Sequence, residues 1–268
     1  MSNILQKPVS ALLRRVMITF VTMLGALPAP AKDRPLKVGL IEFGPLVVYN
    51  SNQAGGLLID YARPILEQAG MPLIFQNLSI DRSLEELKNN QLDLVLTLFK
   101  TPERERWVQF SRQPLLTVAN GFCTESDIEL RPLTAESRLA HVRGTVVPPA
   151  LQFLKRVPVS GDKAQIRMVQ MLSKKRVEAI YSPKPEILMF VAHEAGLGQS
   201  LFCYELRKSR IAIHIGFSKD LPASTIQKIE ESLERKIQDE AFDDYLGKRL
   251  QSIGAKKPVL KEFDPDIR

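Results

Sequence analysis

The sequence is poor in the residues on which metal and redox chemistry depend. Its 268 residues include two cysteines and three histidines, and none of them stands in a CxxC, HExxH or mixed Cys/His pattern. A GxSxG nucleophile elbow is also missing. Isolated histidines of this kind are usually structural. The sequence therefore predicts no metal site and no cofactor, and it identifies no catalytic residue.

The two cysteines leave two interpretations open. In an oxidising compartment Cys123 and Cys203 can pair, and the chain-entropy model values a loop of that length at roughly 4 kcal/mol. Two buried free thiols are the alternative, because sequence alone does not give the distance between them.

Extended runs of one charge sign are also missing. The formal net charge is +7, and the basic runs "SKKR" (173–176) and "RKSR" (207–210) stand among acidic residues without interleaved aromatic ones. A nucleic-acid interface needs a basic stripe, commonly with stacking aromatics, so we expect a solvated surface and no nucleic-acid partner.

Long apolar runs are missing after the first 31 residues. Lys7, Arg14 and Arg15 precede the apolar run "VMITFVTMLGALPAPA", which ends in Ala29-Pro30-Ala31. This order predicts a signal peptide over residues 1–31 that is cleaved on export; an uncleaved anchor is the alternative. No cysteine ends the run to accept a lipid, so a bacterial periplasm is the expected location.

Strand and helix patterns alternate along the rest of the chain, which predicts an α/β fold with mostly parallel sheets. The predicted strands are 36–41, 72–78, 92–99, 115–126, 140–147, 177–182 and 209–220. The predicted helices are 55–70, 81–90, 149–156, 162–176, 185–196, 222–240 and 241–250. The strand over 115–126 separates two α/β units and favours two lobes.

Arg104 stands at a position suited to ligand binding. Thr101 is a good helix N-cap and Pro102 suits the first helical position, so "TPER" predicts a helix that begins directly after a strand. Ligands of open α/β sheets bind outside the carboxyl ends of strands, and a guanidinium matches a carboxylate. A pair with a surface glutamate is the alternative for Arg104.

The order of several segments resembles a known family. "LEELKNNQLDLVLTLFKTPERERWVQFSRQPLL" (84–116), "VRGTV" (142–146) and "KKRVEAIYSPKPEIL" (174–188) are similar to extracellular solute-binding proteins of polar amino acid ABC transporters. The resemblance covers essentially the whole chain after the leader. It implies the type II periplasmic-binding-protein fold, in which two α/β lobes joined by a hinge close on a ligand.

The resemblance also implies lobe boundaries and binding residues. Lobe 1 would comprise 32–115 plus 212–268, and lobe 2 would comprise 116–211. Arg104 would grip the ligand's α-carboxylate together with Gly144 and Thr145. Phe43 would stack on the ligand, although a core role is equally open, and Thr97 and Phe99 would line the end of the strand before Arg104.

One position departs from the family pattern. The family commonly reads "VDAVIADEPVAL" where this chain has "VEAIYSPKPEIL", so the aspartate that accepts hydrogen bonds from an α-amino group falls at Pro183. A proline side chain accepts no hydrogen bond. Tyr181, Ser182 and Glu186 are the residues that can compensate. This favours a small carboxylate or other anion over a typical amino acid.

The sequence analysis therefore predicts a monomeric periplasmic solute-binding protein that captures a small anionic or amino-acid-like ligand, with an ABC transporter permease as the implied partner. Two alternatives stay open. Some relatives with this fold are cyclohexadienyl dehydratase-like enzymes, and the fold also occurs in orphan ligand-sensing domains.

Overall fold

The computed structural model describes residues 34–50, 53–161, 163–197, 201–255 and 260–264. The predicted signal peptide lies outside these residues. Among the helices that are described, none combines the length and the apolar character that crossing a membrane requires. Residues from Leu36 onward form one compact unit, and the description that follows concerns this unit.

The first half of the main sheet is parallel and carries the N-terminal strands. Its order is β4–β1–β5, with β1 parallel to both neighbours. These strands are β1 (Leu36–Leu40), β4 (Leu73–Asn77) and β5 (Leu94–Phe99). Helices α2 (Leu57–Glu67) and α3 (Ile80–Lys88) connect them, and the hairpin β2 (Val48–Asn50) and β3 (Gln53–Gly55) precedes α2. Helix α2 continues through Pro64, so the predicted helix is confirmed.

The second half of the sheet is also parallel. Its strands are β8 (Arg138–Val142), β9 (Lys155–Val159) and β10 (Ala179–Ser182), in the order β10–β8–β9. Helix α5 (Ala164–Ser173) connects β9 to β10, and α6 (Ile187–Glu194) follows β10. Strands alternate with helices in the first half, and from β9 onward in the second half, as the sequence predicts.

The predicted helix over 149–156 is wrong. Only Pro149–Leu151 forms a short 3₁₀ helix, η1, and the chain then enters β9. Val157 and Val159 at the end of β9 are β-branched, and parallel pairing with β8 supplies main-chain partners that a sequence pattern does not reveal. Pro158 is tolerated because β9 is the last strand of this side of the sheet.

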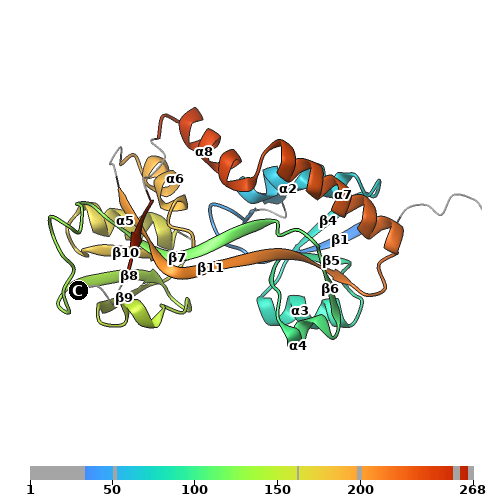
Figure 1. Ribbon diagram of the computed structural model, residues 1–268, viewed down its shortest axis with the longest axis horizontal. Helices are drawn as coiled ribbons and strands as arrows, with labels where there is room; N and C mark the ends of the chain where they lie inside the picture. The colour runs from blue at the N-terminus through green and yellow to red at the C-terminus, as the bar shows by residue number, and fades with distance from the viewer. Residues whose placement is uncertain (1–33, 51–52, 162, 198–200, 256–259, 265–268) are drawn as a thin grey trace, which may run out of the picture. The chain divides into compact units, whose positions relative to one another are not determined.

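Two long antiparallel strands run between the sheet halves, β7 (Leu116–Thr124) and β11 (Phe202–Ser218) (Figure 1). They pair with each other in two stretches, and the register shifts between Glu205 and Arg210. Lys208 takes a left-handed backbone conformation within this shift, with φ of 58°. Cys123 and Cys203 lie opposite each other in the first stretch and form a disulfide, which decides between the two interpretations of these cysteines.

The C-terminal helices α7 (Ala223–Asp239) and α8 (Phe242–Ser252) pack on α2. The ring of Tyr61 lies 5.2 Å from that of Phe242 and 5.4 Å from that of Tyr245, and its hydroxyl donates to the Glu240 carbonyl at 2.8 Å. Burial raises the pKa of Tyr61 to about 12, so this hydroxyl stays a donor.

Two short strands complete the sheet by pairing with β11. They are β6 (Val108–Phe110), which is antiparallel to it, and β12 (Leu260–Phe263), which is parallel.

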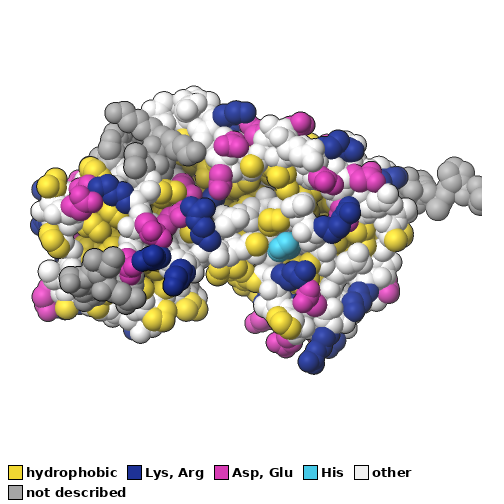
Figure 2. Space-filling model, viewed as in Figure 1, with side chains coloured by type: hydrophobic (Ala, Val, Ile, Leu, Met, Phe, Trp, Pro, Cys, Tyr) yellow, Lys and Arg dark blue, Asp and Glu magenta, His cyan; other side chains and the backbone are white. Residues whose placement is uncertain are grey.

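On the face shown in Figure 2, basic and acidic side chains are interspersed and no large area has a single charge sign. Charge on this face is therefore not arranged as a basic stripe.

Candidate functional site

The loops of interest leave the carboxyl ends of neighbouring parallel strands. In the first half, Val38 of β1 pairs with Leu94 of β5, so the loops after β1 and β5 leave the same edge. In the second half, Leu139 of β8 pairs with Ala179 of β10, which places the loops after these strands at one edge too. Such edges are where open α/β sheets bind ligands.

Arg104 lies in the short helix α4 (Pro102–Glu105), which begins directly after β5 as predicted. The Thr101 hydroxyl accepts a hydrogen bond from the Arg104 main-chain N–H at 3.3 Å, which fixes the start of the helix. Nη1 of Arg104 donates to the Phe99 carbonyl at 3.0 Å. No carboxylate of the described residues lies within ion-pair distance of Arg104, so the remaining donors of its guanidinium are not neutralised within this part of the chain.

Thr97 and Phe99 are two residues apart on β5, so both side chains lie on one face of the strand. Thr97 is half-buried, whereas Phe99 is 41% exposed despite its size. Because Arg104 bonds to the Phe99 carbonyl, these three predicted residues lie together at the end of β5.

Phe43 lies in the loop after β1, where it forms two main-chain hydrogen bonds with Val47 at 2.9 and 3.0 Å. The loop is fixed on the start of α2, because the carbonyls of Pro45 and Leu46 accept from the first N–H groups of that helix. Gly56 permits this contact, since a Cβ there would lie 2.7 Å from the Pro45 oxygen. The Phe43 ring is half-buried and packs against the core, and its role towards a ligand stays a prediction.

Gly144 and Thr145 form the turn after β8. Gly144 is exposed and takes a left-handed conformation with φ of 87°, which favours glycine. The Thr145 N–H donates to the Val142 carbonyl at 3.1 Å, and its hydroxyl bonds to the same oxygen. Both Thr145 donors that the resemblance assigns to a ligand are thus used within the turn.

Lys184 follows β10 and is a residue that the sequence analysis did not single out. Its side chain is 2% exposed, and its ammonium donates to Asp243 at 2.8 Å, to the Thr117 carbonyl at 3.2 Å and to Glu186 at 3.4 Å. A lysine between two prolines directly after a fully buried strand is the only signal for it in the sequence.

Of the residues expected to compensate for Pro183, Tyr181 and Ser182 are used in the protein's own contacts and Glu186 is used in part. One Glu186 oxygen faces Lys184, while the other, although buried, has no hydrogen-bond partner among the described residues. The Tyr181 hydroxyl lies 2.6 Å from Oδ1 of Asn120, and burial raises its pKa to about 12. The Ser182 hydroxyl bonds to the main chain of Lys184.

The predicted residues therefore form two groups. Thr97, Phe99 and Arg104 lie together, and Phe43 leaves the same sheet edge. Among the described residues, no hydrogen bond or ion pair joins this group to Gly144 and Thr145. The two halves come close to each other next to Phe43. A Cβ added to Gly44 would lie 3.9 Å from Oε1 of Gln165, which is on α5 of the second half.

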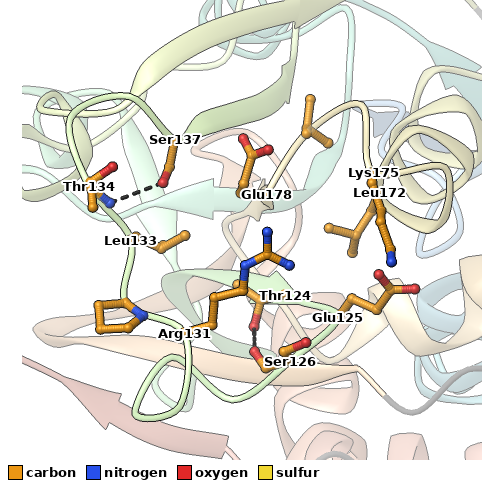
Figure 3. Close-up of a pocket in the computed structure, with 12 residues that line it drawn as sticks. Thr124, Glu125, Ser126, Arg131, Leu133, Thr134, Ser137, Leu172, Lys175 and Glu178 are labelled. Carbon is orange, nitrogen blue, oxygen red and sulfur yellow. Dashed lines mark hydrogen bonds between the residues drawn. The ribbon is translucent and has the colours of Figure 1, made fainter.

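A cavity of about 260 Å³ lies elsewhere, in the second half (Figure 3). Its walls come from the end of β7, the loop 125–137 and the segment from Leu172 to Glu178. None of the six predicted residues lines it. Within the described chain, no cluster of three or more His, Cys, Asp or Glu side chains is arranged to hold a metal ion.

Comparison with protein families places this geometry in context. The family model of bacterial extracellular solute-binding proteins, family 3, matches residues 36–250. The chain therefore belongs to this family, and it has the two-lobed α/β fold of periplasmic binding proteins. A comparison with curated protein sequences gave no match.

Solved structures with the same fold have low sequence identity. An ancestral cationic amino acid solute-binding protein is 20% identical with a TM-score of 0.63, over 80% of this chain and 94% of that one. An amino acid ABC transporter substrate-binding protein from Streptococcus pneumoniae, bound to L-arginine, is 16% identical with a TM-score of 0.57, over 81% and 94%. The GluR0 ligand-binding core from Nostoc punctiforme, in complex with L-glutamate, is 20% identical with a TM-score of 0.55, over 80% and 98%.

Proposed function

We propose that this protein captures a small carboxylate between its two lobes and that Arg104 binds the carboxylate. The observation that carries the proposal is the Arg104 guanidinium at the end of β5, which bonds to the Phe99 carbonyl and has no carboxylate partner among the described residues. A guanidinium presents a planar fork of donors that matches a carboxylate in geometry and charge. Membership of a solute-binding family supports ligand capture rather than a purely structural role.

The ligand we propose lacks the α-ammonium group of an amino acid. Pro183 replaces the usual acidic acceptor, and the nearest carboxylate along the chain, Glu186, already faces the Lys184 ammonium. The Lys184 ammonium therefore already occupies one oxygen of this carboxylate. An organic acid without an amino group satisfies Arg104 and requires no acceptor at this edge.

Apolar side chains suggest that the ligand also has an apolar body. Phe99 is 41% exposed beside Arg104, and Val146 is 85% exposed beside Thr145. Burial of these side chains against a ligand removes apolar surface from water, which favours closure. Phe43 would add a third apolar wall. Gly144 and Thr145 would contribute donors once the Thr145 hydroxyl rotates away from the Val142 carbonyl.

In this proposal the lobes are those expected from the sequence, with residues 32–115 and 212–268 in one and 116–211 in the other. Strands β7 and β11 would act as the hinge, because both run between the sheet halves. Export to the periplasm through the leader, a monomeric state and delivery of the ligand to an ABC permease complete the proposal. An enzyme of the same fold and a ligand-sensing domain are the competing functions.

A thermal-shift screen against amino acids, keto acids, dicarboxylates and aromatic acids tests the proposal. A ligand at a hundredfold excess over its Kd should stabilise the protein by about 2.7 kcal/mol. We expect a shift with an acid that lacks an amino group and no shift with that acid in Arg104→Ala. An amino acid as the best ligand would contradict the assignment of Pro183 and Lys184. Conversion of the acid during incubation would identify an enzyme instead.

A further inference from the structure

The cavity in the second half has features of a second binding site. Its volume of about 260 Å³ is slightly below the range of sites for drug-sized ligands, so there is room for a small molecule. It lies between the segment after β7 and the end of α5, and so it is separate from the Arg104 group. Figure 3 shows Arg131 extending into the middle of the space that these segments enclose.

Arg131 is an exposed residue that brings positive charge to this cavity. Its guanidinium makes no hydrogen bond or ion pair with any described residue. Glu178 lines the same cavity, but its carboxylate already accepts hydrogen bonds from Arg138, at 2.9 Å from Nη2 and at 2.7 Å from the main-chain N–H. These bonds lower the pKa of Glu178, so the charge that faces Arg138 is already compensated.

Hydroxyl donors surround the same space. The Ser137 hydroxyl, in a residue that is 9% exposed, accepts from the Thr134 N–H at 3.0 Å, which leaves its own proton free to donate. The Thr134 hydroxyl accepts from the Glu136 N–H at 3.3 Å and likewise keeps its proton. Lys175 adds an ammonium to the wall. Donors from Arg131, Lys175, Ser137 and Thr134 therefore line the cavity. Of its two carboxylates, Glu125 and Glu178, the second is already paired with Arg138, and such a wall favours an anion.

We infer that this cavity binds a small monocarboxylate, with Arg131 as its principal ligand-binding residue. The charge of the cavity wall favours a monoanion. Arg131 and Lys175 are positive and Glu125 is negative, while the charge of Glu178 is compensated by Arg138. The planar fork of Arg131 selects a carboxylate over a spherical halide. This site is independent of the proposed function, since none of its residues is assigned to the Arg104 group.

Nuclear magnetic resonance titration of the isotope-labelled protein with acetate and propionate tests the inference. We expect saturable shifts of the Arg131 Nε–H and of the amides in 124–137 and 172–178, with a Kd on the order of 1 mM, as a few charge-assisted hydrogen bonds allow. Chloride at equal ionic strength should not produce them. Arg131→Ala should weaken binding roughly tenfold or more, and Arg131→Lys should fall between.

Two control variants test whether the shifts come from this cavity or from another arginine. Arg156→Ala removes an exposed positive charge from β9 in the same half of the sheet and should leave the titration unchanged. Arg104→Ala should also leave it unchanged, which makes failure here distinguishable from failure of the proposed function. Shifts that do not saturate, that chloride reproduces, or that persist in Arg131→Ala would overturn the inference. The spectrum of each variant reports directly whether it is folded.

Discussion

Lys184 illustrates how a single buried charge is accommodated. Taking an ammonium out of water costs several kcal/mol unless partners replace the water. Here its three N–H donors face three acceptors from different parts of the chain: Asp243 on α8, Thr117 on β7 and Glu186 at the start of α6. The side chain therefore ties a loop of the second sheet half to a C-terminal helix and to a strand that joins the halves.

Loss of Lys184 should be far more costly than loss of its exposed partner. Lys184→Met leaves Glu186 buried without its cation, and we expect the free energy of unfolding to fall by about 3 kcal/mol. Asp243 is 54% exposed, so Asp243→Asn should cost less than about 1 kcal/mol. Urea denaturation of both variants followed by circular dichroism gives the comparison. Small and equal losses would mean that the contacts of Lys184 with Glu186 and Asp243 do not stabilise the fold.

The residues of the site differ in how well they can be predicted from the sequence. The position of Arg104 could be predicted because Thr101 and Pro102 are local signals for a helix start, and the structure has the helix there. The role of Lys184 could not be predicted, because its nearest partner, Asp243, lies 59 positions away in the sequence and only folding brings the two together. The expectation for Thr145 was incomplete, since sequence does not show that its hydroxyl bonds to the Val142 carbonyl.

At the scale of elements, β12 shows how a short strand is fixed beside a longer one. It pairs in parallel with residues 203–206 of β11, and Lys261 within it lies 2.5 Å from Asp127 and 3.1 Å from Glu129. Asp127 also accepts from the Tyr204 hydroxyl at 2.8 Å. The hydrogen bond from Lys261 is the largest cause that lowers the pKa of Asp127 to about 2, followed by those from the Glu129 N–H and Tyr204.

This shift predicts a pH dependence of stability. The folded-state pKa of Asp127 is below its ordinary value of 3.8, so its stabilising contribution is present above about pH 4 and is lost as the pH falls towards 2. Asp127→Asn should therefore be less stable than the parent protein at pH 5, and the difference should vanish near pH 2. Urea denaturation of both proteins at the two pH values measures this. A difference that is the same at both values would contradict the role of Asp127.

Elements with long periodic patterns were predicted well, and those that depend on partners were not. Helix α2 is expected from one apolar face, and β5 from an apolar run whose first three residues are all buried. By contrast, β9 and β12 are short strands whose main-chain bonds come from β8 and β11. Their stability comes from neighbours that are distant in sequence, which local patterns do not encode.

At the scale of the whole molecule, the disulfide joins the two strands that run between the sheet halves. Cys123 on β7 and Cys203 on β11 are 80 positions apart, and the bond closes the part of the chain that contains the second half. Such a crosslink restricts the unfolded chain far more than the folded one. It also holds together the paired strands that we propose as the hinge.

Reduction of the disulfide should lower stability substantially. For a loop of 80 residues the chain-entropy model gives a loss of about 4 kcal/mol in the free energy of unfolding. Urea denaturation with and without a reducing agent measures it. In the double variant Cys123→Ala/Cys203→Ala, the reducing agent should have no effect. Equal midpoints for the oxidised and reduced parent protein would show that the bond does not stabilise the fold.

The central claim, that Arg104 binds the carboxylate of the captured ligand, is tested most directly by isothermal titration calorimetry with the acid that the screen identifies. The parent protein, Arg104→Ala and Arg106→Ala should be compared, because Arg106 is an exposed arginine two residues further along the chain. We predict that Arg104→Ala weakens binding by about 30-fold, as expected for a lost charge-assisted pair, and that Arg106→Ala binds as the parent does. Equal affinities for the parent and Arg104→Ala would contradict the account.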